Sequence, residues 1–384
     1  MGGLCCARAT SALVLMLDGR CAWACCIGIC CVVGGLAACD DGSMSGPGAD
    51  DGGDGGEAPL CLSEVARFDG ARSYVHSVTW SPIDDLVAVG TDSELRLVEV
   101  DTAAQTLELA AELSDRATAG VTRWSPDGRY LVTAGLELKL VEVQRDPPAL
   151  RQLAALAGNL GSFHGMDLSA DGLHVMTGER GGAVRVFAVD LAAGTLTERA
   201  TFVGNAAAVF GVSWSPDGRH AVSVGEDGRV RLLKVDHEAD PVTISELAVW
   251  QDADQENAVR WARSGNPLLT GTWSRRHVIQ VWNVDVDAGT LELQSEFVDH
   301  PTGINTMEWS GDRQRIVTGG HDDTMRLAAY DGAVLTTMAV LEDHDSGVHS
   351  VAWSRDEAYM IMASSMVDRI ALIDMRACPA AAGD

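Results

Sequence analysis

Lysine is almost absent from this sequence, since only Lys139 and Lys234 occur among its 384 residues. The 28 basic residues stand against 55 acidic ones, which gives a net charge of −27 at pH 7. A chain with this excess of negative charge repels phosphate backbones, which excludes nucleic acid as a partner held by the overall field of the protein.

The common signatures of enzymes and metal sites are also missing. The sequence contains no Gly-x-x-x-x-Gly-Lys loop, no His-Glu-x-x-His pair and no Gly-x-Ser-x-Gly elbow. The alternating acids of residues 252–256 lack the glycine of a calcium loop, so a solvated loop is the better interpretation. On these motifs we expect no cofactor, no metal and no catalytic residue.

Cysteine is scarce outside the N-terminal segment, because only Cys61 and Cys378 follow Cys39. An uncharged run, residues 21–38, ends in Leu-Ala-Ala-Cys at Cys39, a tetrapeptide that resembles the lipobox of bacterial lipoproteins. The resemblance implies a leader at residues 1–38, lipidation of Cys39 and a lipid-anchored protein on the extracytoplasmic side of a bacterial cell envelope. A single transmembrane anchor stays open, because the run approaches the ~20 residues that span a bilayer.

Glycine and acid dominate residues 39–59, which contain no base. This composition predicts a flexible, self-repelling tether without secondary structure. The rest of the chain differs, because 46% of all residues are apolar and suffice for a core.

One motif of the form Val-x-Trp-Ser-Pro-Asp-Gly recurs along the body of the chain, at intervals of about 45 residues. Its third position is occupied by Trp80, Trp124, Leu168, Trp214, Trp261, Trp309 and Trp353. Within each interval, alternating apolar and polar residues are separated by turn residues, which indicates four β-strands. Seven such units predict an all-β, seven-bladed propeller of four-stranded antiparallel blades over residues 60–378, with a tail at 379–384. Residues 62–68 fit a fourth strand, so we expect them to complete blade 7.

The repeats resemble those of the WD-repeat family. Residues 343–348 are similar to the Gly-His start of that family's repeat, residues 225–232 to its third-strand signature, and Val281-Trp282-Asn283 to its Trp-Asp pair. The family's histidine is kept only at His300 and His344, so its structural hydrogen-bond tetrad is not expected in most blades. The resemblance implies a non-catalytic, monomeric interaction platform, and the predicted location makes a protein of the cell envelope the expected partner.

Cys61 and Cys378 fall in neighbouring columns when the repeats are aligned on the tryptophans, namely those of Gln105 and Ala103. Positions two residues apart lie within about 7 Å, which is close to the Cα separation that a disulfide requires. We predict a disulfide between them that closes the ring, and two unrelated thiols are the alternative.

Charged residues precede the tryptophan column in four blades. Arg123 and Asp167 lie in neighbouring blades, as do Arg260 and Glu308. Inner strands converge on the axis of a propeller, so these side chains are candidates for the lining of the central channel. They form either two ion pairs between blades or a polar site for a small ligand.

Partner-binding candidates are expected at one mouth of the channel, four positions before the tryptophan column. The residues in that column are His76, Gly120, His164, Phe210, Asn257, Asn305 and His349. Three histidines could ligate a metal, but His164 lies two blades from His76, so contact with a partner or a hydrogen bond at the strand end is the better interpretation. Trp273, Arg275, Arg276 and His277 form a cationic, aromatic turn where other blades are acidic, which favours either a binding surface or an ordinary exposed turn.

A hydrolase is the alternative function. Residues 189–196 recur as residues 284–291, and both are similar to a linker of seven-bladed lactonases. The resemblance implies a pocket of Arg, His and Glu side chains, for which Arg123, Arg260, Glu308 and His164 have suitable types. A simple hairpin turn explains the same recurrence.

Overall fold

The computed structural model describes residues 16–17, 20–21, 62–70, 73–114, 120–157, 165–251, 254–263, 265–298, 300–342, 346–364 and 369–376. The chain divides into two compact units, Met1–Gly56 and Glu57–Asp384. In the first unit, β1 (Met16–Leu17) pairs with β2 (Arg20–Cys21). Across the described ranges, no helix has the length and apolar character that crossing a membrane requires. The predictions for Cys39 and the tether lie outside the described residues.

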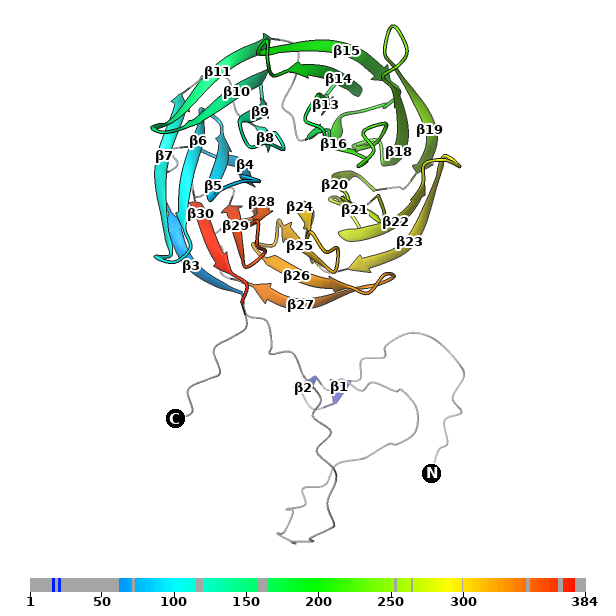
Figure 1. Cartoon of the computed structure of the whole chain (residues 1–384). Coiled ribbons are helices and arrows are strands. Elements are labelled where there is room, and N and C mark those ends of the chain that lie inside the picture. The colour runs from blue at the N-terminus through cyan, green and yellow to red at the C-terminus, as the bar shows by residue number, and fades with distance from the viewer. Residues whose placement is uncertain are drawn as a thin grey trace, which may run out of the picture. The chain divides into compact units, whose positions relative to one another are not determined.

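The described part of the second unit consists of seven four-stranded antiparallel sheets arranged in a ring (Figure 1), which confirms the predicted all-β propeller. Blade 1 contains β4 (Val75–Trp80), β5 (Leu86–Thr91), β6 (Glu94–Asp101) and β7 (Thr106–Ser114). Blade 2 contains β8 (Val121–Trp124), β9 (Tyr130–Ala134), β10 (Glu137–Arg145) and β11 (Pro148–Ala157). Blade 3 contains β12 (Gly165–Leu168), β13 (His174–Gly178), β14 (Ala183–Asp190) and β15 (Thr195–Val203).

The other four blades repeat this order from the axis outward (Figure 1). Blade 4 contains β16 (Val209–Trp214), β17 (His220–Gly225), β18 (Arg229–Asp236) and β19 (Thr243–Gln251). Blade 5 contains β20 (Glu256–Trp261), β21 (Leu268–Thr272), β22 (Val278–Asp285) and β23 (Thr290–Val298). Blade 6 contains β24 (Ile304–Trp309), β25 (Arg315–Gly320), β26 (Met325–Tyr330) and β27 (Leu335–Leu341). Blade 7 contains β28 (Val348–Trp353), β29 (Tyr359–Ser364), β30 (Arg369–Asp374) and β3 (Ser63–Phe68).

The N-terminal strand closes the ring as predicted. β3 pairs antiparallel with β30, in a register that runs from Ser63 opposite Asp374 to Phe68 opposite Ile370. Cys61 and Cys378 lie outside the described residues, so their disulfide stays a prediction. The register is consistent with it, because it brings the start of β3 beside the end of β30.

The hydrophobic core lies between blades rather than within them. One cluster, for example, joins Trp80 and Val98 of blade 1 to Ile361 and Leu372 of blade 7, all of them buried. A single sheet would leave both of its faces in water, so each blade depends on its neighbours for burial. The ring is therefore expected to unfold as one cooperative unit.

The tryptophan column ties consecutive blades together. The indole of Trp124 donates a hydrogen bond to the carbonyl oxygen of Thr79 in the preceding blade at 3.0 Å, and that of Trp353 donates to Glu308 at 3.4 Å. At these two joints the column combines apolar packing with a polar bond across the blade interface, whereas the indole of Trp261 donates to the carbonyl oxygen of Gly265 in its own blade.

The residues that follow the tryptophan column form a turn closed by side chains. In five blades, a serine hydroxyl donates to the aspartate two positions later. The five pairs are Ser125 and Asp127, Ser169 and Asp171, Ser215 and Asp217, Ser310 and Asp312, and Ser354 and Asp356. This hydrogen bond lowers the pKa of Asp312 and of Asp356 below the ordinary value, because it stabilises the ionised carboxylate.

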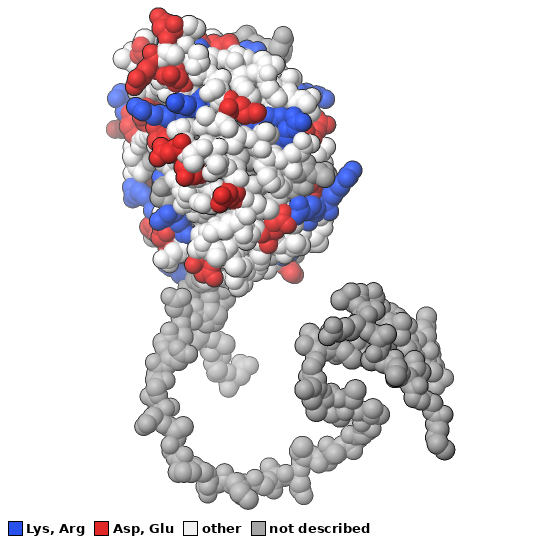
Figure 2. Space-filling model, turned by 90° about the vertical axis from the view of Figure 1, so that its right-hand side faces the viewer, with Lys and Arg blue, Asp and Glu red and all other residues white. Residues whose placement is uncertain are grey.

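Charge is spread over the outer wall of the ring. Figure 2 views that wall from the side and shows Asp and Glu interspersed with Arg, without a large patch of one sign. On this side of the ring, the acidic residues therefore contribute to the overall negative field of the protein and do not form one charged site.

Candidate functional site

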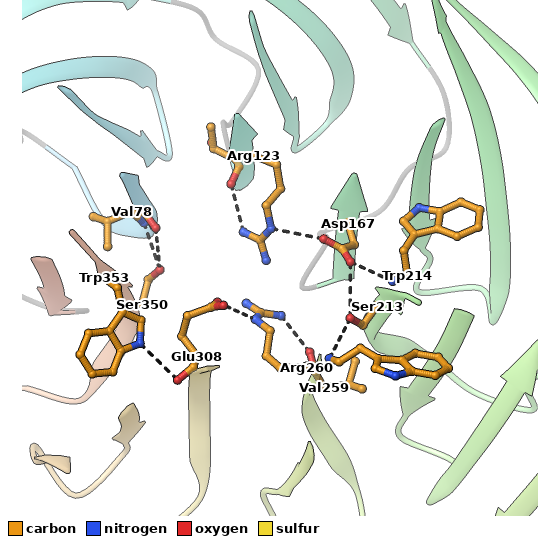
Figure 3. A network of polar contacts seen from close by, with 12 residues as sticks. Val78, Arg123, Asp167, Ser213, Trp214, Val259, Arg260, Glu308, Ser350 and Trp353 are labelled. Atoms are coloured by element: carbon orange, nitrogen blue, oxygen red, sulfur yellow. Dashed lines mark hydrogen bonds and ion pairs between the residues drawn. The ribbon is translucent and has the colours of Figure 1, made fainter. Parts of the chain in front are cut away.

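The first strands of the blades surround the central channel and carry the two predicted charge pairs (Figure 3). Arg123 Nε lies 3.6 Å from Asp167 Oδ1, and Arg260 Nε lies 3.0 Å from Glu308 Oε2. Each guanidinium also donates to the backbone carbonyl of the preceding residue of its own strand, at 3.0 Å from Arg123 and 2.9 Å from Arg260. The structure therefore brings all four channel candidates together as two ion pairs between neighbouring blades.

Burial sets the electrostatics of the channel. It lowers the pKa of Arg123, and the positive charge of Arg260 lowers it further, while Asp167 and Glu308 oppose the shift. Burial likewise raises the pKa of Asp167, against the stabilising charge of Arg123 and the backbone N–H of Trp214. The two arginines thus repel each other near the axis, and each is neutralised by a carboxylate.

The channel network continues into the next blades, which favours a structural role. Asp167 Oδ2 accepts hydrogen bonds from the Trp214 N–H at 2.8 Å and from the Ser213 hydroxyl at 3.4 Å. The Ser213 hydroxyl in turn accepts from the N–H of Trp261 at 3.2 Å. Blades 2 to 6 are connected through these groups, so the charges hold inner strands together.

A small hollow lies between the first strands beside Arg260. Gly165, Gly211, Asn257 and Asn305 are among the residues that line it. The amide of Asn257 donates to the carbonyl of Ile304 at 3.1 Å, and that of Asn305 donates to Val348 at 3.2 Å. The asparagines of the predicted mouth column are therefore ties to the following blade.

The propeller has two ends, and one of them carries most of the predicted partner-binding residues. Because the strands are antiparallel, the hairpins between second and third strands lie at the same end as the connections between blades. We call this end the mouth face. His76, Trp273 and His349 lie there, Phe210 is half-buried there, and His164 lies outside the described residues.

Five aromatic rings form a continuous row on the mouth face, which we call the ring arc. Its members, from blade 5 to blade 1, are Trp273, His321, His349, Tyr74 and His76. Consecutive ring centroids lie 6.2, 6.5, 5.3 and 4.9 Å apart. The structure therefore joins His76 and His349 of the predicted mouth column to Trp273 of the predicted turn, and it adds His321 and Tyr74.

Hydrogen bonds fix the blade 1 end of the ring arc. The hydroxyl of Tyr74 lies 2.9 Å from His349 Nε2, across the joint between blades 7 and 1. His76 Nε2 lies 2.6 Å from Asp92 Oδ1, in the hairpin between β5 and β6. Within the described residues, no group of three or more His, Cys, Asp or Glu side chains is arranged to hold a metal ion. These histidines contact aromatic and carboxylate neighbours instead.

The turn at residues 273–277 is built around the buried carboxylate of Asp254. That carboxylate accepts hydrogen bonds from the Ser274 hydroxyl and from the backbone N–H of Arg275 and Arg276. Burial alone would raise the pKa of Asp254, but these hydrogen bonds outweigh it and lower the pKa. Arg276 pairs with Glu296, while Arg275 is exposed. His277 has a positive φ of 48° and ends the turn.

A column of basic residues on the third strands was not anticipated from the sequence. Its members are Arg96, Lys139, Arg185, Arg231 and Arg326. Each pairs with a carboxylate near the hairpin of its own blade, as Arg231 does with Asp227 at 2.7 Å while only 1% of its side chain is exposed. Aligning the repeats on the second and third strands, where one of the two lysines falls in this column, would have revealed it.

Blades 5 and 6 each keep part of the hydrogen-bond tetrad expected of the WD-repeat family. In blade 6, His300 Nδ1 lies 2.9 Å from Asp322 Oδ1, and its Nε2 lies 2.8 Å from the hydroxyl of Thr318. In blade 5, the indole of Trp282 donates to the hydroxyl of Thr270 at 3.0 Å. These contacts are divided between two blades, which agrees with the expectation that most blades lack the full tetrad.

The segments that suggested a lactonase are hairpin turns. Residues 189–196 connect β14 to β15, and residues 284–291 connect β22 to β23. The carboxylates of Asp190 and Asp285 each accept two backbone N–H groups of the turn, at 2.8 to 3.0 Å. Asp101 and Asp331 do the same in blades 1 and 6. Hairpin closure accounts for the recurrence, so it carries no argument for hydrolysis.

The WD40 family (WD domain, G-beta repeat) matches residues 196–233, 291–327 and 335–373. Each matched segment begins in or beside the fourth strand of one blade and ends in the third strand of the next. No curated protein matches the chain. This chain therefore carries WD40 repeats on a seven-bladed propeller.

Proposed function

We propose that this protein is a non-catalytic interaction platform, which binds a partner protein of the bacterial cell envelope on its mouth face. The ring arc is the observation that carries the proposal. Trp273, 42% exposed, and the exposed His321 lie on hairpins, where a rigid scaffold presents binding residues. Tryptophan, tyrosine and arginine are the residues that dominate binding energy in protein interfaces.

The scaffold supports this function because the charged groups of the channel and of the third strands already form ion pairs within the propeller. The channel pairs connect blades 2 to 6, and the third-strand bases pair with carboxylates of their own blades. None of these groups is required to move for a partner to bind at the surface. A platform with a fixed backbone binds mostly through its exposed loops, which agrees with the position of the ring arc.

The proposal includes attachment to the membrane through a lipid on Cys39, with a glycine-rich tether that holds the monomeric propeller outside the cytoplasm. The leader-like sequence before Cys39 supports this part. A flexible tether leaves the mouth face free to meet a partner at varying distance from the membrane.

The test is capture of partners by the tagged full-length protein from detergent-solubilised native membranes. Two variants are compared, Trp273→Ala with His321→Ala on the mouth face, and Ile83→Ala with Leu173→Ala on the opposite face. Ile83 and Leu173 are exposed by 43% and 47%, which makes them a matched control. We expect an envelope protein that is captured by the wild type and the control but lost from the mouth-face variant. Equal capture by all three would refute binding through the ring arc.

A further inference from the structure

We propose that the ring arc docks an extended, positively charged segment of the partner, whose Arg or Lys side chains lie over the rings. This inference rests on the proposed function and names the kind of partner. It follows from the continuity of the rings, from the space that the fold leaves for them and from the charges beside them.

The ring arc forms a long, continuous path, which suits an extended segment. It crosses four consecutive blades from blade 5 to blade 1, with no centroid separation above 6.5 Å. Its rings differ in tilt, since Trp273 and His321 are inclined by 28° while His321 and His349 are inclined by 84°. Because the rings present both faces and edges along the row, a bound segment has several positions at which its side chains can stack.

Two glycines provide the space for this row at the joints between blades. A side chain at Gly303 in blade 6 would collide with the indole of Trp273, which belongs to blade 5. A side chain at Gly347 in blade 7 would collide with the imidazole of His321, which belongs to blade 6. Neither glycine has a positive φ, so the close approach of the ring, rather than the backbone conformation, requires glycine.

Carboxylates accompany the rings in blades 6 and 1. Asp92 is 51% exposed and hydrogen-bonded to His76, and Asp323 is exposed two positions after His321. The arginines of these two hairpins are hidden instead. Arg96 has 3% of its side chain exposed and pairs with Glu94, and Arg326 has 17% exposed and pairs with Asp322.

This arrangement favours a cation in the partner. A guanidinium or ammonium group over an aromatic face contributes roughly 0.5–1 kcal/mol at an exposed site, and an adjacent carboxylate adds to it. The net charge of −27 attracts a basic segment from a distance. Arg275 is exposed two positions after Trp273 in the blade 5 hairpin, so the preference for basic side chains is expected to be strongest over blades 6, 7 and 1.

The experiment measures binding of three fluorescein-labelled nonapeptides to the full-length protein in detergent, by fluorescence anisotropy in low salt. The peptides repeat Gly-Gly-Arg, Gly-Gly-Lys or Gly-Gly-Glu three times. We expect the arginine peptide to bind most tightly, the lysine peptide less tightly and the glutamate peptide not detectably. Binding of the arginine peptide should weaken as salt rises, because exposed charges are screened.

Variants locate the binding and separate the rings from the charge. Asp92→Asn with Asp323→Asn should weaken the arginine peptide about tenfold, and Trp273→Ala about threefold. The control Glu238→Gln with Asp287→Asn removes the same charge on the opposite face, where the side chain of Glu238 is 89% exposed, and should change the affinity less than about twofold. Thermal unfolding of each variant verifies that it is folded.

Three results would overturn the inference. One is tighter binding of the glutamate peptide, and another is an arginine affinity that the mouth-face variants leave unchanged. The third is concentration-dependent self-association that Trp273→Ala abolishes, which would make a second copy the occupant. If the mouth-face variant loses the captured partner but the protein prefers the acidic peptide, the positive charge proposed for the docked segment is refuted and the platform function is retained. If the arginine peptide binds at the ring arc but no envelope partner is captured, the platform function is refuted and the preference for a basic segment is retained.

Discussion

Asp322→Asn is expected to destabilise the propeller in a way that depends on pH. Burial would raise the pKa of the Asp322 carboxyl, but hydrogen bonds and charge from His300 and a hydrogen bond from Thr324 lower it from 3.8 to about 2. The difference of about 1.8, at 1.36 kcal/mol for each pH unit, corresponds to about 2.4 kcal/mol of stability. Only 7% of this side chain is exposed, so solvent screening removes little of that energy.

The sign of the pH dependence follows from the lowered pKa. The ionised carboxylate stabilises the folded state, so its contribution is complete well above pH 3.8 and is lost as the pH falls towards 2. At pH 3 about half of it, roughly 1.3 kcal/mol, is left. The asparagine variant cannot ionise and therefore lacks this contribution at every pH.

Urea unfolding of the full-length protein, followed by tryptophan fluorescence at pH 7 and pH 3, measures both quantities. We expect the variant to lose about 2.4 kcal/mol at pH 7 and about half as much at pH 3, by the linkage worked above. Asp287→Asn, an exposed acid of the β22–β23 hairpin, is the control and should cost less than about 0.5 kcal/mol. A loss below about 1 kcal/mol at pH 7, or an equal loss at both pH values, would refute the role assigned to His300 and its partners.

Three further predictions concern the ends of the chain and the repeated turn. Differential alkylation followed by mass spectrometry should find Cys61 joined to Cys378, and reduction should cost roughly 4–5 kcal/mol by chain entropy; two free thiols would contradict the ring closure by a disulfide. Cys39→Ser should abolish incorporation of labelled fatty acid and release the protein from membranes, whereas a variant that stays in the membrane would indicate a transmembrane anchor. Ser125→Ala removes the hydroxyl that accepts a hydrogen bond from the N–H of Tyr130 at 3.0 Å, and it should lower the free energy of unfolding in urea by about 1–2 kcal/mol. The control is Ser63→Ala at the exposed start of β3, which should cost almost nothing.

Much of the fold could be predicted from the sequence, because its signals are local and repeated. The tryptophan column fixed the number of blades, and the alternating pattern fixed the number of strands in each. The closing strand β3 followed from counting strands at the two ends of the repeat. The two channel pairs could also be anticipated, because equal positions in neighbouring blades must approach each other near the axis.

The ring arc could be predicted only in part, because its members occupy different positions in their repeats. His76 and His349 belong to first strands, whereas Trp273 and His321 belong to hairpins between second and third strands. Aligning the repeats column by column separates these two classes. Their contact depends on how far each hairpin reaches towards the next blade, and Gly303 and Gly347 control that distance through packing.

The polar contacts beneath the mouth face explain how the ring arc can differ between blades without loss of the fold. In blade 6, His300 and Arg326 both contact Asp322, which anchors the hairpin that carries His321. In blade 4, Arg231 and Asp227 anchor the corresponding hairpin. A buried carboxylate with a buried base positions each of these two hairpins from below, so the exposed residue at the tip is not needed for stability. The exposed tips can therefore vary for binding, and substitutions there should change affinity more than they change the free energy of unfolding.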